Sequence, residues 1–111
     1  MITQAQIYNA KIISLDIENS LKKIWPVDVH VDDWSDYGSF RIFITLNVSS
    51  NFVTLPLRKI GNVIRKEIEH SRFHAVLERL EMPRRTYSRF FYRRYFNGYN
   101  GNVIMLDYRV Y

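Results

Sequence analysis

The sequence predicts an α+β two-layer sandwich, in which a four-stranded, mostly antiparallel sheet carries two helices on one face. Two observations lead to this fold class. Apolar residues recur at helical spacing in two segments and alternate with polar residues in the others, and turn residues divide the segments in the order helix, strand, strand, helix, strand, strand. A chain of 111 residues has room for one hydrophobic core, so we expect a single basic domain over residues 1–111.

The first helix is predicted over about residues 4–24. Thr3 and Gln6 have the spacing of a capping box, and Pro26 ends the helical pattern. One side of this helix carries a stripe of apolar residues at helical spacing: Ile7, Ala10, Ile13, Ile17, Leu21 and Ile24. This stripe is the side that we expect to face the core.

A second apolar stripe on the same helix consists of Tyr8, Ile12 and Leu15. Because each helical residue advances by about 100°, these three side chains fall on nearly the opposite side from the first stripe. Either the helix is buried on both sides or a few exposed apolar residues are tolerated, or the second stripe is a surface for self-association.

Two strands follow, over residues 27–32 and 40–48, in which apolar and polar residues alternate. Residues 34–38 between them, Trp-Ser-Asp-Tyr-Gly, have the composition of a turn. The two strands are therefore predicted to form an antiparallel hairpin. Residues 49–51 then mark a loop.

The second helix is predicted to open at Thr54 and Pro56 and to continue to about Leu80, before Met82 and Pro83 break it. Its last turns carry apolar residues that point about 150° away from the apolar stripe of its first part, if the helix is straight: Phe73, Val76, Leu77 and Leu80. Either the helix bends near residues 70–73, or its end packs against another element or another subunit. We therefore add Phe73, Val76 and Leu80 to the candidate interaction surface.

The last two strands are predicted over residues 84–96 and 103–110. Asn97-Gly98 and Asn100-Gly101 lie between an aromatic run and a β-branched run, which is a strong hairpin signal. In the alternative interpretation, Pro83 begins a short helix that ends near Gly98. The two halves of the chain thus share one element order, without a residue-level repeat.

Charge is distributed unevenly along the chain. The net charge is +5, yet residues 1–54 hold four basic and six acidic side chains, whereas residues 55–111 hold twelve basic and five acidic ones. Such asymmetry indicates an anionic partner such as nucleic acid, although basic domains without one are common. No segment approaches the roughly 20 apolar residues of a membrane span, and the N-terminus lacks the pattern of a signal peptide.

Arginines recur every seven residues along the predicted second helix, at Arg58, Arg65, Arg72 and Arg79. Seven residues fall about 20° short of two turns, so these side chains form one slowly drifting ridge. The ridge either follows a phosphate backbone or shields the border of the core with its aliphatic stems.

The segment 84–99 contains five arginines and seven aromatic residues. In a strand, Tyr87, Arg89, Phe91, Arg93 and Tyr95 share one face. Aromatic rings can stack on unpaired bases while guanidinium groups contact phosphates. Alternatively, the second face of the hairpin is a solubilising surface where arginines lie over rings. From the ridge and this segment we name the following candidate nucleic-acid-binding residues: Arg58, Arg65, Arg72, Arg84, Arg85, Tyr87, Arg89, Phe91, Arg93, Arg94 and Tyr95.

Catalytic and metal sites find little support. The chain has no cysteine, and it lacks phosphate-binding loops and nucleophile motifs. His70 and His74 are four residues apart on the predicted helix, but a third ligand is not obvious. Asp32, Asp33 and Asp36 cluster in a turn without a supporting lysine, so we interpret them as a polar turn.

We therefore expect a non-enzymatic module, without cofactor, metal or small-molecule substrate, that binds nucleic acid through the second helix and the C-terminal hairpin. The alternative is a small self-assembling or protein-interaction component, for instance a structural or host-inhibitory protein of a virus or phage. A metal-dependent nuclease is a third and weaker hypothesis. We expect a cytoplasmic location, or a virion if the protein is viral, and neither secretion nor a membrane partner.

Overall fold

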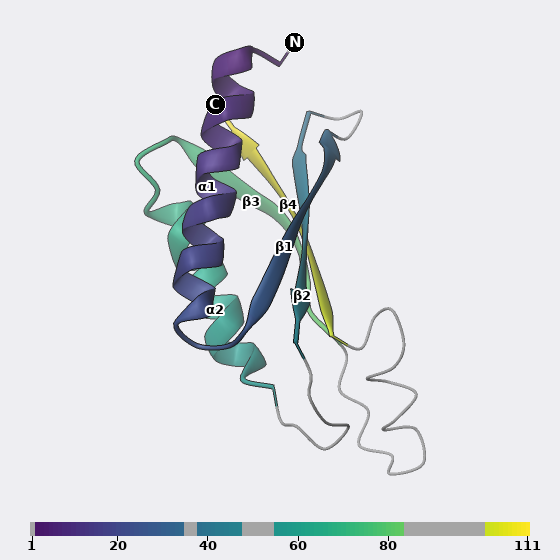
Figure 1. The fold of residues 1–111 in the computed structure, drawn as a ribbon. Helices are drawn as coiled ribbons and strands as arrows, with labels where there is room; N and C mark the ends of the chain where they lie inside the picture. Colours follow the sequence, from purple (N-terminus) through teal and green to yellow (C-terminus); the bar gives the residue numbers. More distant parts are fainter. Residues whose placement is uncertain (1, 35–37, 48–54, 84–101) are drawn as a thin grey trace.

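The protein is described here by a computed structural model, which covers residues 2–34, 38–47, 55–83 and 102–111 (Figure 1). In these residues the chain forms two helices and four strands, so the α+β class predicted from the sequence is confirmed. The elements follow in the order α1 (Gln4–Lys22), β1 (Val27–Trp34), β2 (Phe40–Leu46), α2 (Leu57–Glu69), β3 (Ala75–Glu81) and β4 (Val103–Val110).

The strands form one sheet in the order β1-β2-β4-β3, and every neighbouring pair is antiparallel. The predicted first hairpin is confirmed, with Val29 opposite Ile44. In its connection Gly38 has a φ of 83°, a backbone conformation that glycine adopts without steric cost. At the centre of the sheet, Ile42 lies opposite Leu106.

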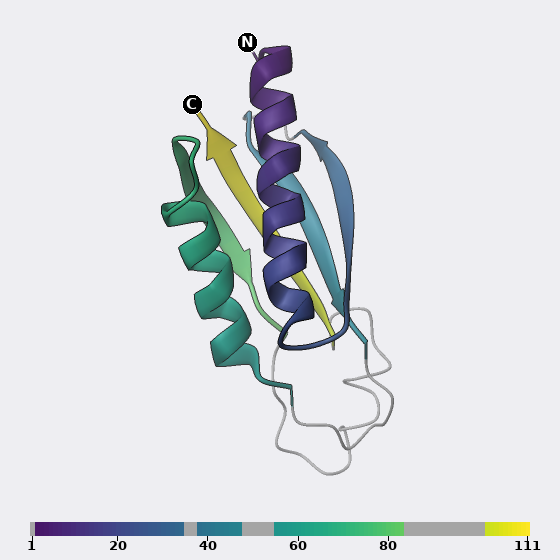
Figure 2. The same ribbon diagram turned by 60° about the vertical axis from the view of Figure 1, so that its left-hand side comes forward.

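Both helices lie on one face of the sheet, and no helix of the described chain covers the other face (Figures 1 and 2). The core fills the space between the two layers. The helices supply it with Ala10, Ile13, Ile17, Leu21, Ile60, Ile64 and Ile68. The two central strands supply Phe40, Ile42, Ile44, Leu46, Ile104, Leu106, Tyr108 and Val110. The alternation of buried and half-buried residues along β2 follows from the opposite directions of successive side chains.

The start of α1 is the predicted capping box. The Thr3 hydroxyl accepts a hydrogen bond from the Gln6 backbone N–H at 3.1 Å, and the Gln6 side chain accepts one from the Thr3 N–H at 2.8 Å. These two bonds satisfy donors that the first helical turn leaves unpaired. Gln6 also donates to the Val110 carbonyl at 3.0 Å, which ties the first turn to the end of β4.

The predicted extent of the second helix is wrong. The helix begins at Leu57, after Pro56, and ends at Glu69 instead of continuing to Leu80. Ser71 makes a tight turn there, since its hydroxyl accepts from the Phe73 N–H at 3.2 Å and donates to the Phe73 carbonyl. The residues of the predicted last turns are strand β3.

The observed partners of β4 also differ from the predicted ones. We expected β4 to pair with residues 84–96, whereas its described neighbours are β2 on one side and β3 on the other. Residues 84–96 themselves, and with them the choice between strand and helix there, lie outside the described residues. Pairing with β4 buries Leu77 and Ala75 of β3 toward the core, a long-range contact that helical periodicity does not reveal.

The architecture consists of two similar units, α1-β1-β2 and α2-β3-β4. Exchanging the two units leaves the sheet order β1-β2-β4-β3 unchanged except for its direction. Four buried residues of each helix have the same spacing, with Ile13, Ser14, Ile17 and Leu21 in α1 matching Ile60, Gly61, Ile64 and Ile68 in α2, while the buried Ala10 corresponds to the half-buried Leu57. The fold is therefore pseudo-two-fold symmetric in its core, although the sequence shows no residue-level repeat.

Candidate functional site

The outer side of α2 carries four exposed cations, Arg58, Lys59, Arg65 and Lys66, which we call the basic helix face. The helical periodicity of α2 places its apolar residues on the core and these side chains in water. None of the four forms an ion pair with another described residue. The sequence therefore located Arg58 and Arg65 correctly.

The other two members of the predicted ridge lie elsewhere. Arg72 follows the end of the helix, and its guanidinium stands 5.3 Å from the centre of the Phe73 ring. Arg79 is on β3 and pairs with Glu81. The ridge is shorter than predicted because the chain turns at Ser71, so the seven-residue recurrence of arginine continues into a strand.

The beginning of α2 is electrostatically unusual. The N-terminal end of a helix carries the positive end of its dipole, where basic side chains are unfavourable. The first turn of α2 nevertheless carries Arg58 and Lys59 and no acidic residue. An anion bound at this end of α2 would reduce the repulsion between Arg58, Lys59 and the positive end of the helix dipole.

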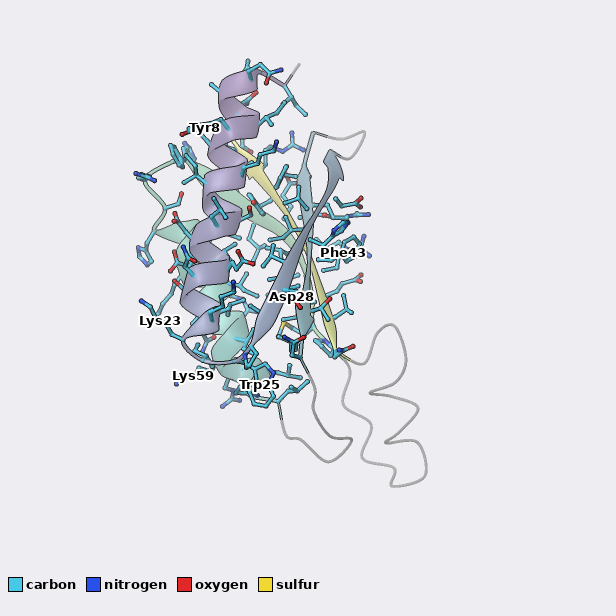
Figure 3. The ribbon with its side chains drawn as sticks, in the orientation of Figure 1. Tyr8, Lys23, Trp25, Asp28, Phe43 and Lys59 are labelled. Carbon is cyan, nitrogen blue, oxygen red and sulfur yellow. The ribbon has the colours of Figure 1, made fainter. Side chains whose placement is uncertain are left out.

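Lys23 after the end of α1 adds an exposed charge at this end of the molecule, and Lys22 beside it forms an ion pair with Glu18 at 3.8 Å. Figure 3 shows Lys23, Trp25 and Lys59 at the end of the molecule where α1 finishes and α2 begins. We call this group, with Lys22 and Arg58, the basic pole. The basic pole is not evident from the sequence, because its members come from segments more than thirty residues apart. The pair Lys22-Lys23 shortly before Trp25 was the available signal.

Trp25 is held firmly at the basic pole. Its indole Nε1–H donates to the Asn47 carbonyl at 2.8 Å, and its backbone N–H donates to the Leu21 carbonyl at 2.9 Å. The half-buried ring packs against the core on its inner side. Because the indole Nε1–H is already hydrogen-bonded within the protein, another molecule can contact this side chain only through the surface of its ring.

The open face of the sheet, which points away from the helices, is different because its arginines are paired. Arg41 forms a two-pronged ion pair with the buried Asp107, with Nε–Oδ1 at 2.7 Å and Nη2–Oδ2 at 3.0 Å. This bond raises the pKa of the Arg41 guanidinium above its ordinary value. Such fork-shaped contacts are the stronger class of charged hydrogen bond.

The edge of the same face has a second pair. Arg109 Nε lies 2.6 Å from Glu78 Oε1, which also accepts from the Ser39 hydroxyl at 3.0 Å. The hydrogen bond from Arg109 holds the pKa of the Glu78 carboxyl below its ordinary value. On the open face five carboxylates, those of Asp28, Asp32, Glu78, Glu81 and Asp107, oppose the three arginines Arg41, Arg79 and Arg109. The described part of this face therefore carries more acidic than basic side chains.

The second stripe of α1 is largely exposed. Tyr8 is 66% exposed and Leu15 is 55% exposed, and Ile12 between them is half-buried. Tyr8 is labelled on the outer side of α1 in Figure 3. Burial of this helix on both sides is therefore wrong, whereas tolerated exposed apolar residues and a self-association surface both agree with this exposure.

The apolar residues expected at the end of the second helix do not extend this stripe. Phe73 and Leu80 are half-buried and pack against the core. Val76 is 44% exposed, but it lies opposite Arg109 on the open face of the sheet. The three residues form no common surface, because successive strand residues point to opposite faces.

The basic-aromatic segment lies outside the described residues. Its candidate residues are Arg84, Arg85, Tyr87, Arg89, Phe91, Arg93, Arg94 and Tyr95. The chain leaves β3 after Glu81 and enters β4 at Val103, and both points lie at the same end of the molecule as the basic pole (Figures 1 and 3). The attachment points of the segment are thus on the side of the basic pole.

The predicted arrangement of His70 and His74 on one helix is wrong. α2 ends before His70, and the His74 ring lies 5.0 Å from that of Tyr111. Within residues 2–34, 38–47, 55–83 and 102–111, no three His, Asp or Glu side chains are close enough to hold a metal ion. Among the described helices, none is long and apolar enough to cross a bilayer.

Comparisons with family models, with curated proteins and with solved structures find no match to this chain.

Proposed function

We propose that this protein is a non-enzymatic module that binds nucleic acid through the basic helix face and the basic-aromatic segment 84–99. The single observation that carries this proposal is the contrast between the two described groups of cations. The arginines of the sheet are bonded to carboxylates, whereas Arg58, Lys59, Arg65 and Lys66 face water without an ion pair to a described residue. When such side chains neutralise phosphates, they release the counterions that surround the nucleic acid. This release is the main source of sequence-independent affinity.

The sequence of segment 84–99 adds a second reason. It brings five more arginines and seven aromatic residues, and its ends are attached at the side of the basic pole. Arginine combines phosphate pairing with stacking on rings or bases, which lysine does less well.

The experiment compares two double variants by fluorescence anisotropy of a labelled mixed-sequence oligonucleotide in a salt series. In Arg58→Gln/Arg65→Gln, we expect weaker binding and a salt slope that falls by about 0.7 to 0.9 for each phosphate that the protein no longer neutralises. Arg89→Gln/Arg93→Gln should act in the same direction. Arg79→Gln is the matched control, because this arginine is on the open face and pairs with Glu81.

Undetectable binding at low salt would overturn the proposal. Equal losses of affinity in Arg79→Gln and in Arg58→Gln/Arg65→Gln would remove the assignment to the basic helix face.

The exposure of Tyr8 and Leu15 favours a second candidate function, self-association through the outer side of α1. Lys11 and Glu18 are seven residues apart and therefore border the stripe on the same side. Two copies of α1 packed antiparallel about a two-fold axis would bring Lys11 of one copy toward Glu18 of the other, while Ile12 meets Leu15. The occupant that this charge pattern fits is thus a second copy of the chain.

Sedimentation velocity over a concentration series tests this second candidate. We expect a dimer that Tyr8→Gln/Leu15→Gln converts to a monomer, whereas Val76→Thr, which changes an exposed apolar residue on the other face, leaves it intact. A monomer at every concentration would exclude this function.

A further inference from the structure

The basic pole combines charge with an aromatic ring, and this combination bears on the kind of nucleic acid that the protein takes. Lys23, Trp25 and Lys59 come from the end of α1, from the connection to β1 and from the start of α2, and all three lie at one end of the molecule (Figure 3). Lys22 and Arg58 are adjacent in the sequence to Lys23 and Lys59, and Lys22 is ion-paired with Glu18. Charge alone would serve any polyanion, so the ring is the informative part.

The position of the ring is set before any ligand arrives. The bonds from Trp25 to Asn47 and Leu21 fix the indole at both its ring nitrogen and its backbone. Asn47 is fixed in turn, because its N–H donates to the Pro26 carbonyl at 3.0 Å. A ring held in this way loses little conformational freedom when a planar group stacks on it.

Duplex and single-stranded nucleic acids differ in what they offer such a ring. In a duplex the bases are already stacked on one another, and the outer surface presents phosphates. In a single strand the bases are unpaired and stack on aromatic side chains, while cations follow the backbone. A fixed, half-buried tryptophan at the same end of the molecule as Lys23, Arg58 and Lys59 matches the second case.

We infer that the basic pole binds single-stranded nucleic acid, with an unpaired base stacked on Trp25 and the adjoining phosphates held by Lys23, Arg58 and Lys59. This inference rests on the proposed nucleic-acid-binding function and deepens it by naming the substrate class. It also assigns a role to Trp25, which composition and charge patterns did not indicate as a binding residue.

Tryptophan fluorescence tests the inference directly. The chain has two tryptophans, Trp25 and Trp34, so the variant Trp34→Phe reports on Trp25 alone. Three probes are titrated at low salt: a single-stranded mixed-sequence oligonucleotide, the corresponding duplex, and inorganic polyphosphate. We expect the single strand to quench Trp25 emission, and the duplex and polyphosphate to leave it nearly unchanged.

Affinity measurements give a second readout. Trp25→Leu should weaken single-strand binding roughly 5- to 150-fold, the range that corresponds to removing one base-stacking interaction. Trp25→Phe keeps a ring and should recover part of this affinity. If Trp25→Leu does not fold, the emission of the Trp34→Phe variant and the affinity of Trp25→Phe still test the inference.

The outcomes separate the two proposals. Binding of single strand and duplex with equal affinity and no change in Trp25 emission would overturn the inference and leave the proposed function standing. Polyphosphate that binds as tightly as the single strand would also overturn it, because charge alone would then account for binding. Failure of every nucleic acid to bind at low salt would remove the proposed function, and the inference with it.

Discussion

The two units of the fold are alike inside and different outside. α1 and α2 bury side chains at the same spacing, and both lie on the same face of one sheet. Outward, α1 presents the apolar residues Tyr8 and Leu15, whereas α2 presents the basic helix face. Packing constrains the buried positions of both helices in the same way, since interiors tolerate little change in volume. The outer positions are not constrained by the fold, and we therefore locate function there.

The central and outer parts of the open face differ in a related manner. Asp107 is 7% exposed and depends on Arg41 for its charge partner, while the pair of Arg79 and Glu81 is largely in water. An arginine–carboxylate pair thus stabilises the centre of the sheet, where it is largely buried, and contributes little to stability at the edge, where it is in water.

The largest expected effect concerns the matched core positions. Ile17→Ala and Ile64→Ala remove equivalent, fully buried side chains, and each should lower the free energy of unfolding by about 2 to 5 kcal/mol. Urea denaturation measures both, with the exposed Leu15→Ala as the control. A cost below about 1 kcal/mol at only one of the two positions would show that the units are not equivalent in packing.

The next effect compares the two ion pairs of the open face. Arg41→Leu leaves Asp107 buried without its partner and should cost about 1 to 3 kcal/mol of unfolding free energy. Arg79→Leu breaks an exposed pair and should cost less than about 1 kcal/mol. Equal effects in denaturation experiments would contradict the distinction between the centre and the edge of the sheet.

Tyr108 joins the second unit to the first, because its hydroxyl donates to the Ala10 carbonyl at 2.6 Å. Tyr108→Phe should cost about 0.5 to 1.5 kcal/mol at neutral pH. Burial raises the pKa of Tyr108 above its ordinary value. The unfolded chain therefore ionises this tyrosine near pH 10, while the folded chain keeps it protonated.

The sign of the pH effect follows from this difference. The contribution of Tyr108 to stability is fully present below about pH 10 and decreases as the pH rises above that value. Denaturation at pH 8 and at about pH 11 should show a steeper loss of stability in the wild type than in Tyr108→Phe. Parallel losses would mean that Tyr108 ionises equally in both states.

The smallest expected effect concerns Gly61, the buried position of α2 that corresponds to Ser14 in α1. A Cβ atom at Gly61 would make ordinary contacts, 3.5 Å from Arg65 and 3.7 Å from Met82. Gly61→Ala should therefore raise the unfolding free energy by about 0.4 to 1 kcal/mol, because the unfolded chain loses freedom. Gly38→Ala is the contrasting control and should destabilise, since its φ is positive. A destabilising Gly61→Ala would show that this helix needs a glycine for close packing.

The local elements of the fold followed from sequence rules, and the errors occurred where long-range pairing decides. The capping box at Thr3 and the first hairpin were predicted because their signals lie within a few residues of one another. Residues 75–81 were assigned to a helix because arginines and apolar residues recur there near helical spacing, while the shift in direction after His70 marked the end of α2. Pairing with β4 outweighed that weak periodicity.

The candidate site divides in the same way. Arg58 and Arg65 were identified from the sequence, since a periodic stripe on a helix is a local property. Trp25 and its neighbouring cations were not, because the basic pole exists only where α1 ends beside the start of α2.

By itself the sequence determined the α+β class, the first helix, the first hairpin and the unequal distribution of charge between the two halves. Each depends on residue type and spacing, which act over one or two turns or across one hairpin. Only the tertiary structure decided that α2 ends at Glu69, that β3 joins the edge of the sheet, and that the sheet arginines are paired while the four cations of the basic helix face have no ion pair to a described residue. These features depend on contacts between residues that are distant in the chain. The free energy of such contacts cannot be inferred from a local sequence pattern.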